Sequence, residues 1–140
     1  MKNILGILLV AIFAILSLLH IYWAAGGRGG SVSAIPAVDG KPIFRPSVFA
    51  TLLVAAALFA AMLTILGNLG LFGEAIPRWI FRSTTFVIAL LFLLRAIGDF
   101  KLLGFFKQIN DTNFAYWDTA VFSPLCLFIT IAAFLINFRK

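Results

Sequence analysis

The chain has 140 residues, of which 63% are hydrophobic and 11% are charged. Soluble domains contain roughly 45 to 50% apolar residues, so this composition excludes an ordinary soluble globule and predicts a single transmembrane domain over residues 1–140. Eleven Lys and Arg against five Asp and Glu give a net charge of +6. We assign this excess to membrane topology and to contact with anionic lipid headgroups, and we expect no nucleic-acid partner.

Four runs are long and apolar enough to cross the hydrocarbon core, which takes about 20 helical residues. They cover residues 3–24, 47–66, 79–98 and 119–138. Arg82 and Arg95 lie near the two ends of the third run, where their side chains can reach toward the membrane surfaces. The predicted fold class is all-α integral membrane: a four-transmembrane-helix bundle with the N and C termini on the same side.

The first run could be mistaken for a cleaved signal peptide. Its apolar stretch is longer than a typical signal core, and His20, Tyr22 and Trp23 stand where small residues should precede a cleavage site. We therefore expect it to stay as a membrane span. Basic residues lie against the helix ends on the side of the termini, which favours cytoplasmic termini.

Small and weakly polar residues mark the faces through which membrane helices contact each other. The fourth run carries such a stripe at helical spacing, which predicts that it faces the bundle interior: Thr119, Ser123, Cys126, Thr130, Ala133 and Asn137. The second run offers a similar face with Ala50, Ala57, Ala61 and Thr64. Pro124 should either begin a shortened helix or kink a longer one.

Charged and titratable side chains within a membrane are costly and are candidates for function. From the alternating helix directions, His20, Arg95 and Ser123 should lie within roughly 5 to 8 Å of the same membrane surface. The adjacent loop begins at Asp99 and ends at Asp118. The candidate ligand-binding residues at this surface are His20, Tyr22, Trp23, Arg95, Asp99, Asp118 and Ser123.

Each candidate also has a structural explanation. Arg95 and Asp99 are spaced for an ion pair within one helix, and Asp118 at the start of the fourth run is the next candidate partner for Arg95. Asp118 directly before Thr119 is typical of a helix N-cap. His20 could serve only to bond a neighbouring hydroxyl or carbonyl.

Catalytic and metal chemistry receives little support. One Cys and one His in the chain exclude an intrachain disulfide and a metal site built on these residue types, and we expect no cofactor. Ser123, His20 and Asp99 or Asp118 could formally make a catalytic triad, but no nucleophile-elbow pattern surrounds the serine. Catalytic residues stay unassigned.

Three segments resemble one known family: residues 20–27 (HIYWAAGG), residues 94–100 (LRAIGDF), and residues 116–119 (YWDT) with 123–126 (SPLC). The sequence is similar, over essentially its entire length, to small bacterial four-helix membrane proteins catalogued as domain of unknown function 3995. The resemblance implies a bacterial multi-pass protein of the cell (inner) membrane. It implies no activity, substrate or site residue.

Three classes of function remain open. The first is a protein with a polar pocket on the non-cytoplasmic side that binds an anionic or amphiphilic small molecule or a lipid, in which Arg95 supplies charge and His20 a titratable group. The alternatives are a small transporter and a structural or accessory subunit of a membrane complex. Membrane lipid is the expected surrounding partner, and a homo-oligomer would be compatible with each class.

Overall fold

The computed structural model describes residues 2–138, in which four helices are long and apolar enough to cross a membrane. They are α1 (Lys2–Ala24), α3 (Val48–Leu69), α4 (Arg78–Ile97) and a composite of α5 (Asn113–Trp117), the π-helical turn η1 (Asp118–Phe122) and α6 (Ser123–Asn137). A short helix α2 (Ser31–Ala34) and the antiparallel pair β1 (Ala37–Val38) and β2 (Lys41–Pro42) lie between α1 and α3. The predicted set of four apolar helices is confirmed.

The fourth helix begins at Asn113, earlier than the predicted start at Thr119. Its N-cap is Thr112, whose hydroxyl accepts a hydrogen bond from the Ala115 amide at 3.1 Å. Asp118 already has helical backbone angles, so the prediction that it caps the helix is wrong. A cap residue keeps its side chain free for the first amides, whereas this carboxylate faces other partners, described below.

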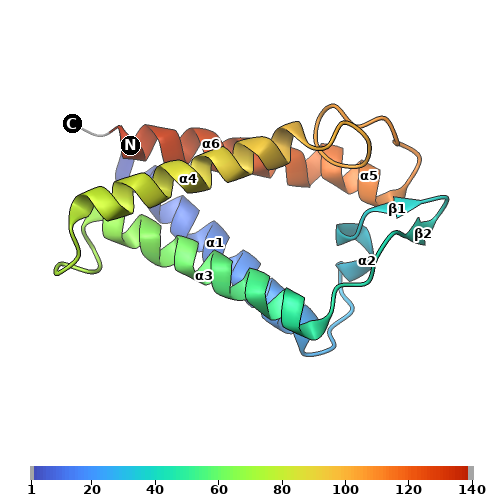
Figure 1. Cartoon of the computed structure of the whole chain (residues 1–140), viewed down its shortest axis with the longest axis horizontal. Coiled ribbons are helices and arrows are strands. Elements are labelled where there is room, and N and C mark those ends of the chain that lie inside the picture. Colours follow the sequence, from blue (N-terminus) through green and yellow to red (C-terminus); the bar gives the residue numbers. More distant parts are fainter. Residues whose placement is uncertain (1, 139–140) are drawn as a thin grey trace.

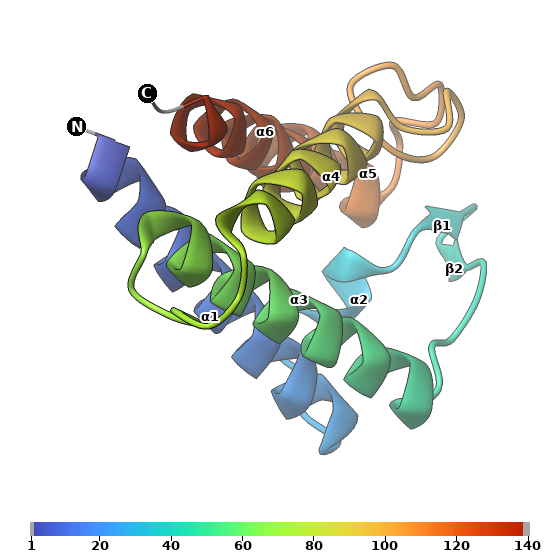
Figure 2. The same ribbon diagram turned by 60° about the vertical axis from the view of Figure 1, so that its left-hand side comes forward.

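The helices form two antiparallel pairs, α1 with α3 and α4 with α6, that meet at an angle (Figures 1 and 2). The pairs approach each other near the α3–α4 connection and the start of α1, which we call the closed end. They separate toward the connection of residues 25–47, which we call the open end (Figure 1). The start of α1 and the end of α6 lie together at the closed end, and the membrane side on which they lie stays a prediction.

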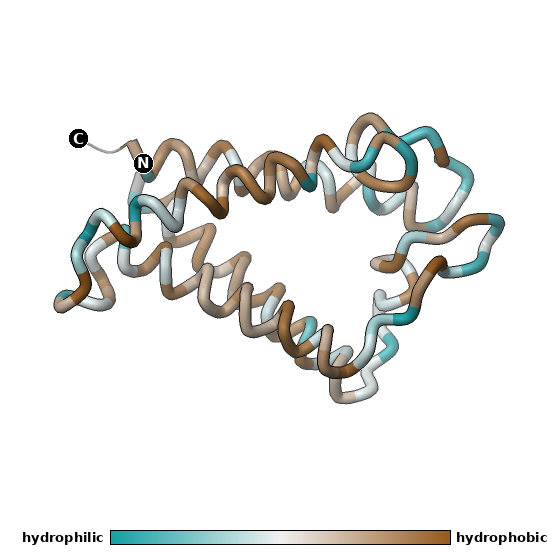
Figure 3. Tube along the Cα trace, in the orientation of Figure 1, coloured by the Kyte–Doolittle hydropathy of each residue, from teal (hydrophilic) through white to brown (hydrophobic). Residues whose placement is uncertain are grey.

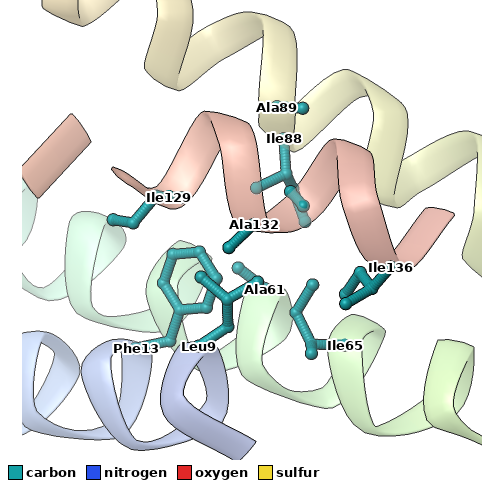
Figure 4. Packing of buried hydrophobic residues seen from close by; sticks show 10 residues of the cluster. Leu9, Phe13, Ala61, Ile65, Ile88, Ala89, Ile129, Ala132 and Ile136 are labelled. Atoms are coloured by element: carbon teal, nitrogen blue, oxygen red, sulfur yellow. The ribbon is translucent and has the colours of Figure 1, made fainter. Parts of the chain in front are cut away.

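A compact apolar core holds the closed half together (Figure 4). Leu9 and Phe13 of α1 and Ile65 of α3 are fully buried against α6, where Ala132 and Ala133 let the neighbouring backbones come close. The core also includes Ala61, Ile88, Ala89, Ile129 and Ile136. All four long helices therefore share one core away from the open end.

Side-chain amides add polar contacts at the closed end. Asn68 of α3 donates to Thr85 of α4 at 3.0 Å and to the side chain of Asn137 of α6 at 3.3 Å. Arg82 donates to the Asn137 carbonyl at 3.3 Å. These bonds tie three helices at one level, where polar groups would otherwise face lipid.

Apolar residues cover most of the long helices, and hydrophilic residues gather at helix ends and connections (Figure 3). The predicted stripe of the fourth helix is confirmed at its buried members Ser123, Cys126, Thr130, Ala133 and Asn137. Thr119 is exposed, because the π-helical turn changes the register at the start of the stripe. The α3 face was predicted less well, since Ala50 and Ala57 are exposed and Ala55 contacts α1 through a 2.9 Å bond from Ser17.

Candidate functional site: a cavity between the helix pairs

A cavity of about 750 Å³ lies between the two helix pairs, in the half of the molecule nearer the open end. Apolar side chains of all four long helices form most of its wall, among them Leu19, Val54, Phe92 and Leu125. Ligand sites usually measure about 300 to 1,000 Å³ and combine an apolar lining with a few polar groups. The cavity therefore has the size and lining of a site for a small amphiphilic molecule.

The connection between α1 and α3 borders the cavity at the open end. Ser31 of α2 and the segment 44–46 contribute to its wall. The Trp23 indole donates to the Gly29 carbonyl at 2.7 Å, and Asn113 of α5 donates to the Ser33 hydroxyl at 2.8 Å. The connection is thus fixed to both helix pairs, which keeps it across the space between them.

One histidine and two arginines belong to the cavity wall: His20, Arg45 and Arg95. His20 approaches the Leu16 carbonyl through Nδ1 at 2.7 Å and packs edge-on against Trp23. A carbonyl oxygen only accepts hydrogen bonds, so Nδ1 is the donor of this bond. Of the three residues predicted at one membrane level, His20 and Arg95 line this cavity and Ser123 does not.

Arg95 pairs with a different acid from the one its sequence spacing suggested. Its Nη2 donates to Asp118 Oδ1 at 2.7 Å, across from α4 to the fourth helix. The alternative of an Arg95–Asp99 pair within one helix is wrong, because α4 ends at Ile97 and the chain turns at Gly98. The spacing rule for helical pairs does not apply once the backbone leaves the helix.

Asp99 instead closes the turn that follows α4. One carboxylate oxygen accepts from the amides of Lys101, Leu102 and Leu103 at 3.0, 2.7 and 2.9 Å. These bonds, led by that from Leu103, hold the pKa of the Asp99 carboxyl below its ordinary value. The residue is exposed and lies outside the cavity wall, so its role is to shape the loop.

Asp118 is fully buried behind Arg95 and has a second set of partners. Its Oδ2 accepts from the Gly104 amide at 2.8 Å and lies 3.3 Å from Nζ of Lys107. The Lys107 side chain is itself 2% exposed, and it also donates to the Gly104 carbonyl at 3.1 Å and to the Thr119 hydroxyl. The loop 98–112 therefore folds back and inserts a cation beside the fourth helix.

The π-helical turn begins at this carboxylate. The Ser123 amide bonds to the Asp118 carbonyl one wide turn away, so both side chains belong to the same buried face. The wider turn also accommodates Pro124, which supplies no amide donor and crowds the preceding turn. Of the buried side-chain nitrogen and oxygen atoms in the described chain, Arg95 Nη1 and Ser123 Oγ have no hydrogen-bond partner.

The structure separates the predicted site residues into two groups. His20, Trp23 and Arg95 line the cavity, whereas Asp118 and Ser123 are buried outside its wall. Asp99 and Tyr22 also lie outside it, and the Tyr22 hydroxyl accepts from the Gly29 amide at 3.3 Å. That any of these residues binds a ligand stays a prediction.

Two residues of this region were missed. Arg45 precedes α3 on the membrane side predicted for His20 and Arg95. This shared side could have identified it as a candidate from the sequence. Lys107 lies in a loop where lysine is normally solvated, and no local pattern indicates its burial.

The arrangement does not assemble a catalytic triad. The His20 Nδ1 faces a backbone carbonyl, and the Ser123 hydroxyl has no partner. Within residues 2–138 no group of three or more His, Cys, Asp and Glu could hold a metal ion. The side chains at the cavity are suited to binding: a wide apolar wall with cationic and imidazole groups near its open end.

Residues 13–133 match the model of a family described as Protein of unknown function (DUF3995). The match covers the cavity, its connection and the Asp118 cluster. No curated protein and no solved structure matches the chain.

Proposed function

The chain belongs to the DUF3995 family, and because this membership carries no activity, we propose a function from the cavity: the protein binds a lipid or another amphiphilic molecule between its helix pairs. The apolar part of the ligand lies against α1, α3, α4 and α6. Its polar group lies toward the open end, near His20, Arg45 and Arg95.

The observation that carries this proposal is the polarity gradient along the cavity. Arg45 precedes the start of α3, and Arg95 and His20 lie in the last turns of their helices, so the polar groups share one level. From that level the wall continues along α3 to Leu58, about 15 Å from the helix start. This deeper wall consists of apolar side chains such as Phe92 and Ile129. A molecule with one polar end and one apolar end matches both parts.

The proposal places the open end in the non-cytoplasmic half of a bacterial inner membrane, following the predicted cytoplasmic termini. A ligand can then enter sideways from the bilayer, because the helix pairs diverge toward this end (Figure 2). Entry from lipid spares an amphiphile the cost of moving its chain through water.

Trp23 in the cavity wall supplies the test. A variant retaining only Trp23 (Trp79→Phe with Trp117→Phe) is titrated in detergent with a dodecyl amphiphile brominated on its chain, which quenches nearby indoles. The control retains only Trp79, which is 68% exposed at the other end of α4. We expect saturable quenching of Trp23 and unsaturable quenching of Trp79. Equal, unsaturable quenching of both would contradict the proposal and favour an accessory subunit.

A matched pair of variants locates the binding. Cys126→Phe fills the cavity, because Cys126 belongs to its wall, whereas Leu127→Phe adds the same ring on the outward side of the same helix. The first variant should lose the saturable component and the second should keep it. Retention of binding in both would place the ligand outside the cavity.

A further inference from the structure

The charges around Asp118 do not balance. Its two carboxylate oxygens face two cations, Arg95 at 2.7 Å and Lys107 at 3.3 Å. The two acids of the preceding loop, Asp99 and Asp111, are both exposed, and Asp99 faces loop amides. One carboxylate neutralises one cation, so the cluster keeps an excess of one positive charge.

The excess charge is presented to the cavity by Arg95. Lys107 is enclosed by Gly104, Thr119 and Asp118 and does not line the cavity. The Arg95 side chain lines the cavity and is 30% exposed, and its Nη1 is buried and has no hydrogen-bond partner in the described chain. Because Lys107 also neutralises Asp118, the carboxylate compensates Arg95 only in part.

The remaining charges on the cavity wall have the same sign. Arg45 adds a second guanidinium group, and none of the acidic residues within 2–138 lines the cavity. Arg45 is exposed, whereas Arg95 is half-buried, and weak dielectric screening in apolar surroundings makes the charge of Arg95 the stronger of the two for a ligand in the cavity.

We infer, resting on the proposed function, that the cavity selects amphiphiles with an anionic polar group, and that Lys107 sets this selectivity without touching the ligand. It is a positioning residue that acts through Asp118 and so leaves the charge of Arg95 available. A phosphate or carboxylate group fits the planar guanidinium donors, whether it belongs to a membrane lipid or to a free fatty acid.

The test compares two amphiphiles that share a dodecyl chain, dodecyl phosphate and the uncharged dodecyl maltoside. Their Kd values are measured in neutral nanodiscs by competition with the brominated amphiphile at Trp23. Wild-type protein should prefer the phosphate. Lys107→Met should reduce that preference on the order of tenfold, as expected for loss of a neighbouring charge, while the Kd of the maltoside stays unchanged.

Three further variants separate charge balance from folding. Lys101→Met removes an equal charge from an exposed position in the same loop and should change neither Kd. Lys107→Arg should keep the phosphate preference. The double variant Lys107→Met with Asp118→Asn restores the excess charge on Arg95 and should restore the preference, which a merely structural lysine would not do.

The outcomes distinguish the two proposals. Failure of wild-type protein to bind either amphiphile would overturn the proposed function itself. Binding of both amphiphiles with equal Kd, or a phosphate preference that survives in Lys107→Met, would overturn only the inferred selectivity. If Lys107→Met does not fold, the double variant is the test. Binding of dodecyl maltoside and dodecyl phosphate with equal Kd in that variant would also contradict the inference.

Competition experiments with anionic phospholipid vesicles and with free dodecanoate identify the source of the ligand. Vesicles of anionic phospholipid that compete with dodecyl phosphate indicate a lipid headgroup, whereas competition by free dodecanoate alone indicates a fatty acid. Competition by neither would contradict anion selectivity at this cavity.

Discussion

The closed and open ends of this molecule are built from the same four helices in different ways. At the closed end, alanines such as Ala132 and Ala133 let α6 pack closely on its neighbours, and neutral amides complete the contacts. At the open end the helix pairs diverge, and an ionic cluster centred on Asp118 joins α4, the fourth helix and the loop 98–112. Close packing needs no charge, whereas the arginine within α4 pairs with an acid, as cations inside membrane spans commonly do.

The difference shows how one small bundle can combine stability with a binding site. The closed end fixes the angle between the helix pairs, and the open end uses that angle to keep space between them (Figures 1 and 4). This contrast can be tested by substitutions at the ionic cluster, on α6, in the amide network and at the Asp99 turn.

The largest effect is expected at Asp118. Asp118→Leu leaves the buried Lys107 and the partly buried Arg95 without their acid, which typically costs about 3 to 5 kcal/mol. Thermal unfolding in detergent should show a large loss of stability relative to wild type. The double variant Arg95→Leu with Asp118→Asn should lose less stability, because fewer unpaired charges remain. A single Asp118→Leu variant as stable as wild type would show that the ionic cluster does not hold the open end.

The same added ring should have different effects at the two ends. Ala133→Phe overpacks a fully buried contact and should cost about 1 to 3 kcal/mol or more. Cys126→Phe, two turns earlier on the same stripe, places its ring at the cavity and should cost less. Leu135→Phe on the exposed face is the control. Equal losses for Ala133→Phe and Cys126→Phe would mean that the cavity cannot accept a ring.

A smaller effect is expected from the amide network of the closed end. Asn68→Leu removes the donor to Thr85 and Asn137, and such bonds between membrane helices average about 0.6 kcal/mol. The free energy of unfolding of this variant should fall only slightly, and ligand binding should be retained. A loss as large as that of Asp118→Leu would reverse the contrast between the two ends.

The sequence predicts the faces and depths of helical residues better than it predicts contacts made by loops. Helical spacing was sufficient to place Ser123, Cys126 and Thr130 inside, and span length placed His20 and Arg95 at one level. These features depend on local periodicity, which the chain itself displays.

The Asp118 cluster depends on contacts that no local pattern records. Gly98 and Gly104 both have positive φ, and a side chain on either would clash with the backbone of the other segment. This close approach returns the loop to the fourth helix and places Lys107 beside Asp118. A helix rule applied to Asp99 or Asp118 could not find it, because the decisive residues are brought together by the loop.

The smallest effect concerns pH and the turn at Asp99. Its folded pKa is lowered, so the folded state binds fewer protons than the unfolded state and this carboxylate stabilises the protein at neutral pH. The contribution is lost as pH falls below the unfolded value of about 4 and then through the lower folded pKa. Asp99→Asn should therefore unfold earlier than wild type at pH 7, and the difference should shrink near pH 3. A constant difference would contradict a role of the charge.

Photolabelling tests most directly whether an amphiphile occupies the open end. A dodecyl phosphate with a diazirine on its chain is activated in the presence of the protein, and labelled residues are mapped by mass spectrometry. We expect labelling of Val54, Leu125 and Cys126, reduced by excess unlabelled dodecyl phosphate. Labelling spread over outward residues such as Leu91 and Leu94, unaffected by the competitor, would contradict binding in the cavity.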